Sequence, residues 1–88
     1  MIRVYLLIIC NPENKYEIYN IFTKLNNVVN VDMLYGPYDI IVEIIFETMD
    51  DLRRKLQKEI KNIDSLISTL TLIQAEDMYD FDKLLVKN

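Results

Sequence analysis

VVNVDMLYGPYDIIVEIIFE, residues 28–47, contains two strand-like segments that are separated by only two residues. Residues 28–35 and 38–47 are rich in β-branched and aromatic side chains, which favour strands. Between them stand Pro37 and the only glycine of the chain, Gly36. Glycine at the first central position permits the positive φ of a type II′ turn, and proline after it fixes a compatible φ. The stretch therefore predicts a tight two-residue antiparallel hairpin.

The segments that flank this hairpin each add one strand and one helix. RVYLLIIC, residues 3–10, is apolar in both alternation phases, as expected of a central strand with two covered faces. Apolar residues at helical spacing predict amphipathic helices over 13–26 and about 49–62. LISTLTLIQ, residues 66–74, is rich in β-branched residues and predicts the fourth strand.

The predicted order is strand, helix, strand, strand, helix, strand, which is typical of a ferredoxin-like α+β fold. Right-handed strand–helix–strand units with this βαββαβ order give an antiparallel sheet with strand order 4-1-3-2 and both helices on one face. We expect one domain over residues 1–75. Residues 76–88 would be a C-terminal extension, with a short helical tail over 77–88.

The face of this sheet that the helices leave open carries aliphatic and aromatic side chains. By alternation, these side chains are Tyr5, Leu7, Ile9, Ile41 and Ile45. An apolar patch of that size is rarely left in water. We expect the sheet of a second copy to cover it, which would give a symmetric homodimer of the dimeric α+β barrel type. The alternative is that the C-terminal tail folds over the same face.

Composition excludes several classes of function. The net charge of −4 argues against a large nucleic-acid interface, although the basic run RRKLQKEIK (53–61) could face phosphates if it is not simply a solvated helix face. The chain has no histidine, the commonest general base and metal ligand, so we predict no catalytic residue, metal site or cofactor.

Its only cysteine, Cys10, is expected in the core. We find no membrane span or signal peptide, which favours a cytoplasmic protein.

Three segments give the chain a resemblance to a known family. They are VNVDMLYGPYDIIVEI, TMDDLRRKLQKEIKNIDSLIST and the Thr-x-Thr strand STLTLI. In this order and spacing they resemble the effector-binding RAM domain of Lrp/AsnC transcription regulators, over about residues 2–75. The resemblance implies the same fold, dimers formed by two packed sheets, and octamer-like rings of such dimers.

The resemblance also implies a ligand site near the loop between the second and third strands. Amino-acid effectors of the family bind there between dimers. By position, Gly36 matches the turn glycine whose backbone approaches the ligand. Asp39 matches the aspartate that meets the ligand's ammonium, and Tyr38 lies beside it. Thr69 and Thr71 match the last-strand residues that help to hold it. The alternative for Asp39 is that its carboxylate only forms hydrogen bonds within its own turn. The alternative for the two threonines is that they occur there only because threonine favours strands.

The expected function is therefore an amino-acid-binding oligomeric module that modulates transcription regulation. The chain begins at its first strand, without the helix-turn-helix of full-length members, so the resemblance is to the stand-alone group. A partner would be a DNA-binding Lrp/AsnC family protein. Alternatives are a cofactor-free small enzyme of the dimeric α+β barrel type, a nucleic-acid-binding protein and a ligand-free structural oligomer. The related ACT domain fits less well, because NPENK (11–15) stands where that domain has a glycine-rich loop.

Overall fold

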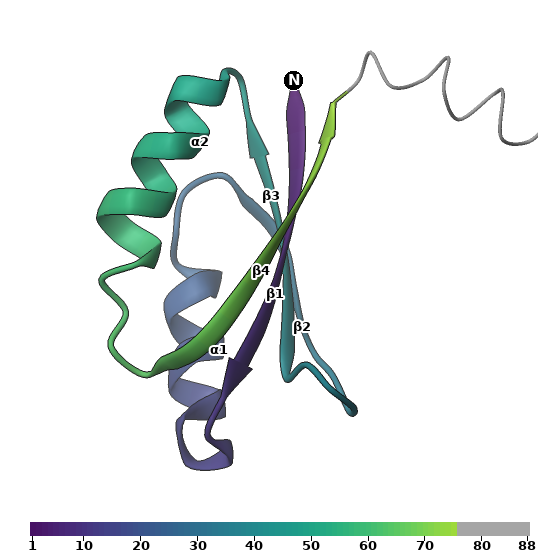
Figure 1. Ribbon diagram of the computed structural model, residues 1–88, viewed down its shortest axis with the longest axis vertical. Coiled ribbons are helices and arrows are strands. Elements are labelled where there is room, and N and C mark those ends of the chain that lie inside the picture. The colour runs from purple at the N-terminus through teal and green to yellow at the C-terminus, as the bar shows by residue number, and fades with distance from the viewer. Residues whose placement is uncertain (76–88) are drawn as a thin grey trace, which may run out of the picture.

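The computed structural model describes residues 1–75 and contains four strands and two main helices (Figure 1). The predicted tail helix over 77–88 lies outside the described residues. The elements are β1 (Ile2–Cys10), α1 (Lys15–Thr23), β2 (Val28–Met33), β3 (Ile40–Phe46), α2 (Met49–Lys55) and β4 (Leu66–Ala75), with a 3-10 turn at Pro12–Asn14 and a π-helix at Leu56–Ile60.

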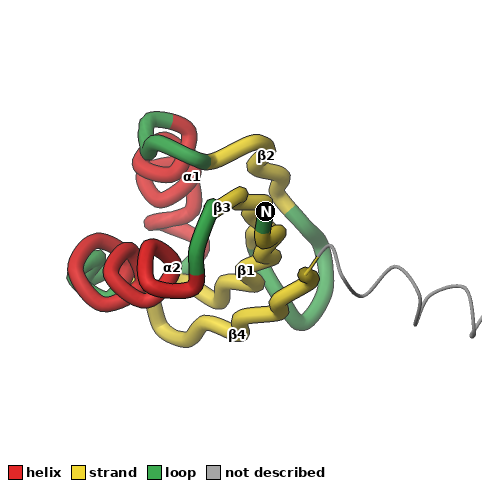
Figure 2. Tube along the Cα trace, turned by 90° about the horizontal axis from the view of Figure 1, so that it is seen from above, coloured by secondary structure: helices red, strands yellow, loops and turns green. Residues whose placement is uncertain are grey.

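The strands form one antiparallel sheet in the order β2-β3-β1-β4, which confirms the predicted topology. β1 and β3 are central, and β2 and β4 form the two edges. Figure 2 shows both helices on the same side of the sheet, as expected for this fold. The opposite side, called the open face below, has no helix over it within residues 1–75.

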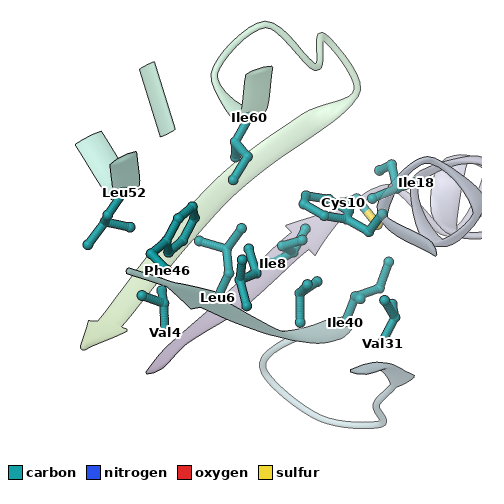
Figure 3. Packing of buried hydrophobic residues seen from close by; sticks show 13 residues of the cluster. Val4, Leu6, Ile8, Cys10, Ile18, Val31, Ile40, Phe46, Leu52 and Ile60 are labelled. Carbon is teal, nitrogen blue, oxygen red and sulfur yellow. The ribbon is translucent and has the colours of Figure 1, made fainter. Parts of the chain in front are cut away.

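The core lies between the sheet and the helices and is made of alternate strand residues. Every second residue of β1 and β3 is buried, because side chains alternate between the two faces of a strand. Figure 3 shows these side chains meeting those of the helices. The core consists of Val4, Leu6, Ile8, Cys10, Ile18, Phe22, Val31, Ile40, Val42, Ile44, Phe46, Leu52 and Ile60. The predicted core position of Cys10, which is 4% exposed, is confirmed.

The second helix begins as predicted but does not continue as one regular helix to residue 62. The Thr48 hydroxyl accepts a hydrogen bond from the Asp51 N–H at 3.1 Å and so caps the first turn of the helix. After Lys55 the helix widens into the π-helix, in which the Lys61 N–H donates to the Leu56 carbonyl at 3.0 Å.

The spacing of the apolar residues gives a physical reason for this change. Leu52, Leu56 and Ile60 recur every four residues, so on a regular turn of 3.6 residues they would drift around the helix by about 40° per step. A wider turn offsets that drift and keeps Ile60, which is 2% exposed, against the core.

The connection between β2 and β3 is longer than the predicted two-residue turn. The register is centred on Gly36 and Pro37, since Met33 pairs with Ile40, and Gly36 has the expected positive φ of 132°. Strand pairing nevertheless stops at Met33 and Ile40, and residues 34–39 form a loop. The reason lies in Asp39: its carbonyl still accepts from the Leu34 N–H across the hairpin, but its N–H donates to the Ile8 carbonyl of β1 and not to β2.

Phe22 and Tyr16 lie on the same helix and provide a matched test of the core. Phe22 is fully buried and Tyr16 is 74% exposed. Phe22→Ala should lower the free energy of unfolding by about 3–5 kcal/mol, because it removes buried apolar area and leaves a cavity. Tyr16→Ala should change it by less than about 0.5 kcal/mol. Urea denaturation measures both, and similar losses in the two variants would contradict this description of α1.

Candidate functional site

The loop of residues 34–39 is organised around Asp39. Figures 1 and 2 show that the loop turns to the side of the sheet away from the helices. The Asp39 N–H donates to the Ile8 carbonyl of β1 at 2.8 Å, and the Asp39 carbonyl accepts from the Leu34 N–H at 2.8 Å. Its carboxylate oxygen Oδ2 accepts from the Cys10 N–H at 2.9 Å. Asp39 therefore closes the loop at Leu34 and joins it to the end of β1.

The bond to Cys10 falls where the sheet is irregular. The register between β1 and β4 shifts between Ile9 and Cys10. Because a buried N–H without a partner is costly, the carboxylate stabilises the strand at this irregularity. Asp39 thus has a structural role beyond its own turn. Its second oxygen, Oδ1, makes no hydrogen bond to any residue of the described part of the chain.

Lys15, at the start of α1, is a residue of this region that the sequence reasoning missed. Its Nζ donates to the Leu34 carbonyl at 3.0 Å and lies 5.5 Å from the centre of the Tyr35 ring. The ammonium thus holds the first half of the loop by a hydrogen bond and a cation–π contact. The sequence contains a hint of this contact. A lysine in the first turn of a helix is unfavourable beside the positive end of the helix dipole, so its presence suggests an interaction outside the helix.

The Cys10 thiol, next to these groups, is not an activated nucleophile. Burial raises its pKa, and the negative charge of Asp39 raises it further, while Lys15 acts in the opposite direction. The net effect is a pKa above the usual value, so the thiol stays protonated near neutral pH. We therefore assign Cys10 to the core and not to chemistry.

The loop also exposes aromatic side chains beside its glycine. Tyr35 is fully exposed and Tyr38 is partly buried. A Cβ added at Gly36 would meet no atom within 4 Å, so the glycine is required by its positive φ and not by crowding. Pro37 has no N–H, which removes one backbone donor from the loop.

Thr69 and Thr71 lie across the sheet from this loop. Both belong to the edge strand β4, and they pair with Ile8 and Leu6, so their side chains share the face that the helices cover. Ile40 and Thr69 both pair with Ile8, which separates them by two strand spacings, or about 10 Å. Within one chain the structure therefore brings Gly36, Tyr38 and Asp39 together and keeps the two threonines apart from them.

The open face carries the apolar residues expected from strand alternation. Leu7 pairs with Ile41 of β3 and Leu70 of β4, so these three side chains form a row across the sheet. All five residues predicted for this face are partly buried in the single chain, and none belongs to the core. Leu70 and Leu72, which are 43% and 47% exposed, extend the same patch. The alternation of side chains in LISTLTLIQ (66–74) contains enough information to predict both leucines on this face.

Polar groups border this apolar patch on one side. Arg3 and Glu43 form an ion pair on the open face. Beside it lies a depression of about 230 Å³, which is lined by Tyr5, Asn30, Asp32, Ile41 and Glu43. The open face thus combines an apolar centre with a charged border, as protein interfaces do.

Comparisons with known proteins place the chain in a family. A family model described as the Lrp/AsnC ligand binding domain matches residues 3–84. The chain belongs to this family. The resemblance seen in the sequence is confirmed, and the match extends beyond residue 75. A search of curated protein sequences gave no match.

Solved structures of Lrp/AsnC-like proteins share the fold. Hypothetical protein PHS023 from Pyrococcus horikoshii has a TM-score of 0.82 and 23% identity, over 85% of this chain and 90% of that one. AsnC from E. coli has a TM-score of 0.79 and 24% identity, over 85% of this chain and 51% of that one. The transcriptional regulator NMB0573 from Neisseria meningitidis, in complex with L-Met, has a TM-score of 0.76 and 9% identity, over 88% of this chain and 51% of that one. The chain spans about half the length of the two regulators.

The described residues contain neither a membrane-spanning helix nor a cluster of metal-ligating side chains. Among the helices of residues 1–75, none is long and apolar enough to cross a membrane. The same residues contain no group of three or more cysteine or carboxylate side chains that could hold a metal ion.

Two variants of Asp39 separate its charge from its hydrogen bond. Asp39→Ala leaves the Cys10 N–H without its acceptor and should lower the free energy of unfolding by about 1–3 kcal/mol. Asp39→Asn keeps an acceptor oxygen and should cost less. Urea denaturation and hydrogen exchange of the Cys10 amide measure the difference. Equal losses in the two variants, with unchanged exchange at Cys10, would contradict the structural role.

Proposed function

We propose that this protein is an effector-binding module of transcription regulation whose ligand is a free amino acid. The observation that carries the proposal is the match of the Lrp/AsnC ligand binding domain model over residues 3–84. A relative of the same fold, NMB0573, is described in complex with L-Met, which supports an amino-acid ligand. The proposal assigns no catalytic step to the chain, which contains no histidine.

The chemistry of the loop suits one end of an amino acid. The free Oδ1 of Asp39 would accept from the ligand's ammonium while Oδ2 keeps its bond to Cys10. A charge-assisted bond of this kind is about twice as strong as a neutral one. The flexible backbone at Gly36 and the adjacent Tyr38 would border the ligand.

The other end of the ligand would be held by a neighbouring subunit. Thr69 lies two strand spacings, or about 10 Å, from the Asp39 side of the sheet, and Thr71 lies farther along β4. The hydroxyls that meet the ligand carboxylate would therefore come from another copy of the chain. Because Pro37 offers no N–H, such hydroxyl donors matter more here. A ligand held this way would favour the assembled form over the separate subunits.

The same proposal includes a homodimer and a higher ring-like oligomer. In the dimer, the open faces of two sheets would pack together and bury Tyr5, Leu7, Ile9, Ile41 and Ile45. Full burial of an exposed side chain of this kind stabilises by roughly 1.5–3 kcal/mol. Because these five are already partly buried in the single chain, the dimer would add only part of that amount for each. The effect on transcription would pass to a DNA-binding protein of the same family, since a net charge of −4 disfavours direct contact with DNA. We expect the protein to act in the cytoplasm.

Calorimetric titration with the twenty common amino acids tests the sensing function. At least one should bind, and Asp39→Asn should weaken that binding by about tenfold or more, because it removes the charge that pairs with the ammonium. The matched control is Asp64→Asn, which removes an exposed carboxylate between α2 and β4. If none of the twenty binds, the effector function is refuted and a ligand-free structural oligomer takes its place.

Light scattering after size-exclusion chromatography tests the assembly. The unmodified protein should elute as a dimer or larger, and Leu7→Lys should shift it toward the monomer, because it places a charge in the centre of the open face. Tyr16→Lys is the control, since Tyr16 is 74% exposed on α1, on the other side of the sheet. A monomeric unmodified protein would rule out the sheet-to-sheet dimer.

A further inference from the structure

A second hollow of the molecule lies far from the loop of residues 34–39. It has a volume of about 400 Å³ and runs between α2 with its π-helix and the start of β2; we call it the α2 groove. Its lining consists of Asn27, Phe46, Glu47, Asp51, Arg54, Lys55, Lys58 and Glu59. Glu47 and Asp39 flank the two ends of β3 and are eight residues apart, or about 26 Å along an extended chain. The α2 groove is therefore separate from the site proposed above.

The floor of the groove belongs to the core, and one rim is hydrogen-bonded to β3. Phe46, in the floor, is 2% exposed and belongs to the core. Asn27, on the rim, has a left-handed φ of 73°. Its side-chain amide donates to the Ile45 carbonyl at 2.9 Å, and its carbonyl accepts from the Ile45 N–H at 3.0 Å. These contacts fix the shape of the hollow without a ligand.

The long wall of the groove is a charged stripe of one helix. Asp51, Arg54, Lys55 and Lys58 are spaced by three and four residues and so lie on one helix face. The three cations of this stripe belong to the basic run RRKLQKEIK (53–61) noted in the sequence, and a role in nucleic-acid binding does not explain why they line a hollow.

Most of the charges in the groove neutralise one another. Arg54 pairs with Asp51 at 2.5 Å, and the Lys55 ammonium pairs with Glu59 at 2.8 Å. The Lys55 side chain is only 14% exposed. The remaining two charges, the Lys58 ammonium and the Glu47 carboxylate, make no ion pair or side-chain hydrogen bond with any residue of the described chain.

We infer that the α2 groove binds a small zwitterion, with its carboxylate at Lys58 and its ammonium at Glu47. Three cations and three carboxylates line the hollow, so a simple anion would meet as much repulsion as attraction, and so would a simple cation. A molecule that carries one charge of each sign matches the one unpaired charge of each sign. The volume lies within the usual range of about 300–1,000 Å³ for small-molecule sites.

The π-helix supports this assignment independently of the charges. Lys58 lies at the middle of the π-helix Leu56–Ile60, and π-helical turns are rare and frequently occur at functional sites. The wide turn serves the core through Ile60, and it also sets the position of Lys58 on the wall of the groove.

Backbone amide NMR shifts, recorded during titration of the full 88-residue chain, test the inference. The probes are glycine, β-alanine and 4-aminobutyrate, whose charges are increasingly far apart, with acetate and methylamine as single-charge controls. At least one zwitterion should move the amide signals of Glu47, Arg54 and Lys58 in a saturable way. Lys58→Met should weaken that binding by about tenfold, because it removes the charge-assisted bond to the carboxylate.

Lys61→Met is the matched control, since it removes a lysine from the same helical segment but outside the groove lining, and it should leave the affinity unchanged. The inference is overturned if no zwitterion moves the groove signals at millimolar concentration, if acetate alone binds equally well, or if both lysine variants weaken binding to the same extent. Shifts confined to residues 36–39 would count against the groove and in favour of the effector site. Groove shifts that persist in Asp39→Asn would establish the groove even if the effector site failed.

Discussion

The central strand β1 imposes the main constraint on this molecule. It is hydrogen-bonded to β3 on one side and β4 on the other, and it is apolar on both faces. The helices cover only the face that carries Leu6 and Ile8. The other face has an apolar centre around Leu7 but no helix over it within residues 1–75. Hence the fold of one chain leaves unfinished a burial that a second copy of the sheet can complete.

Asp39 connects this constraint to the proposed site. One oxygen of its carboxylate accepts from the amide of Cys10 at the end of β1, and the other makes no hydrogen bond within the described chain. A residue that is required for the strand end has a fixed position before any ligand arrives. Such preorganisation lowers the cost of binding, because the side chain loses little further freedom. The structural and the ligand-binding roles of Asp39 are thus compatible, whereas the sequence presented them as alternatives.

The sequence predicted the elements, their order and the buried faces, because these follow from alternation and helical periodicity in long apolar segments. The details that it missed depend on contacts between distant residues. The two-residue turn fails because the Asp39 amide bonds to Ile8, which is 31 positions away, and no local rule contains that contact. The hydrogen bond from Lys15 to the Leu34 carbonyl likewise joins residues that are distant in the sequence. Only half of the proposed effector site could be placed from one chain, since Thr69 and Asp39 lie on opposite sides of β1.

The edge strand β4 has a consequence for the behaviour of the protein at high concentration. Its ten residues, Leu66–Ala75, include no charged side chain and no proline. Soluble proteins usually protect an edge of this length with lysine, proline or a bulge, because a bare edge recruits strands from other molecules. The register of β4 against β1 shifts near the start of β4, between Leu66 and Ser68, so the longer part of the strand, residues 68–75, carries none of these protections. Ile67 and Ile73, exposed by 60% and 49%, add apolar surface beside that edge. Separate subunits would therefore have low colloidal stability, and orderly assembly would protect this chain from aggregation as well as support its function.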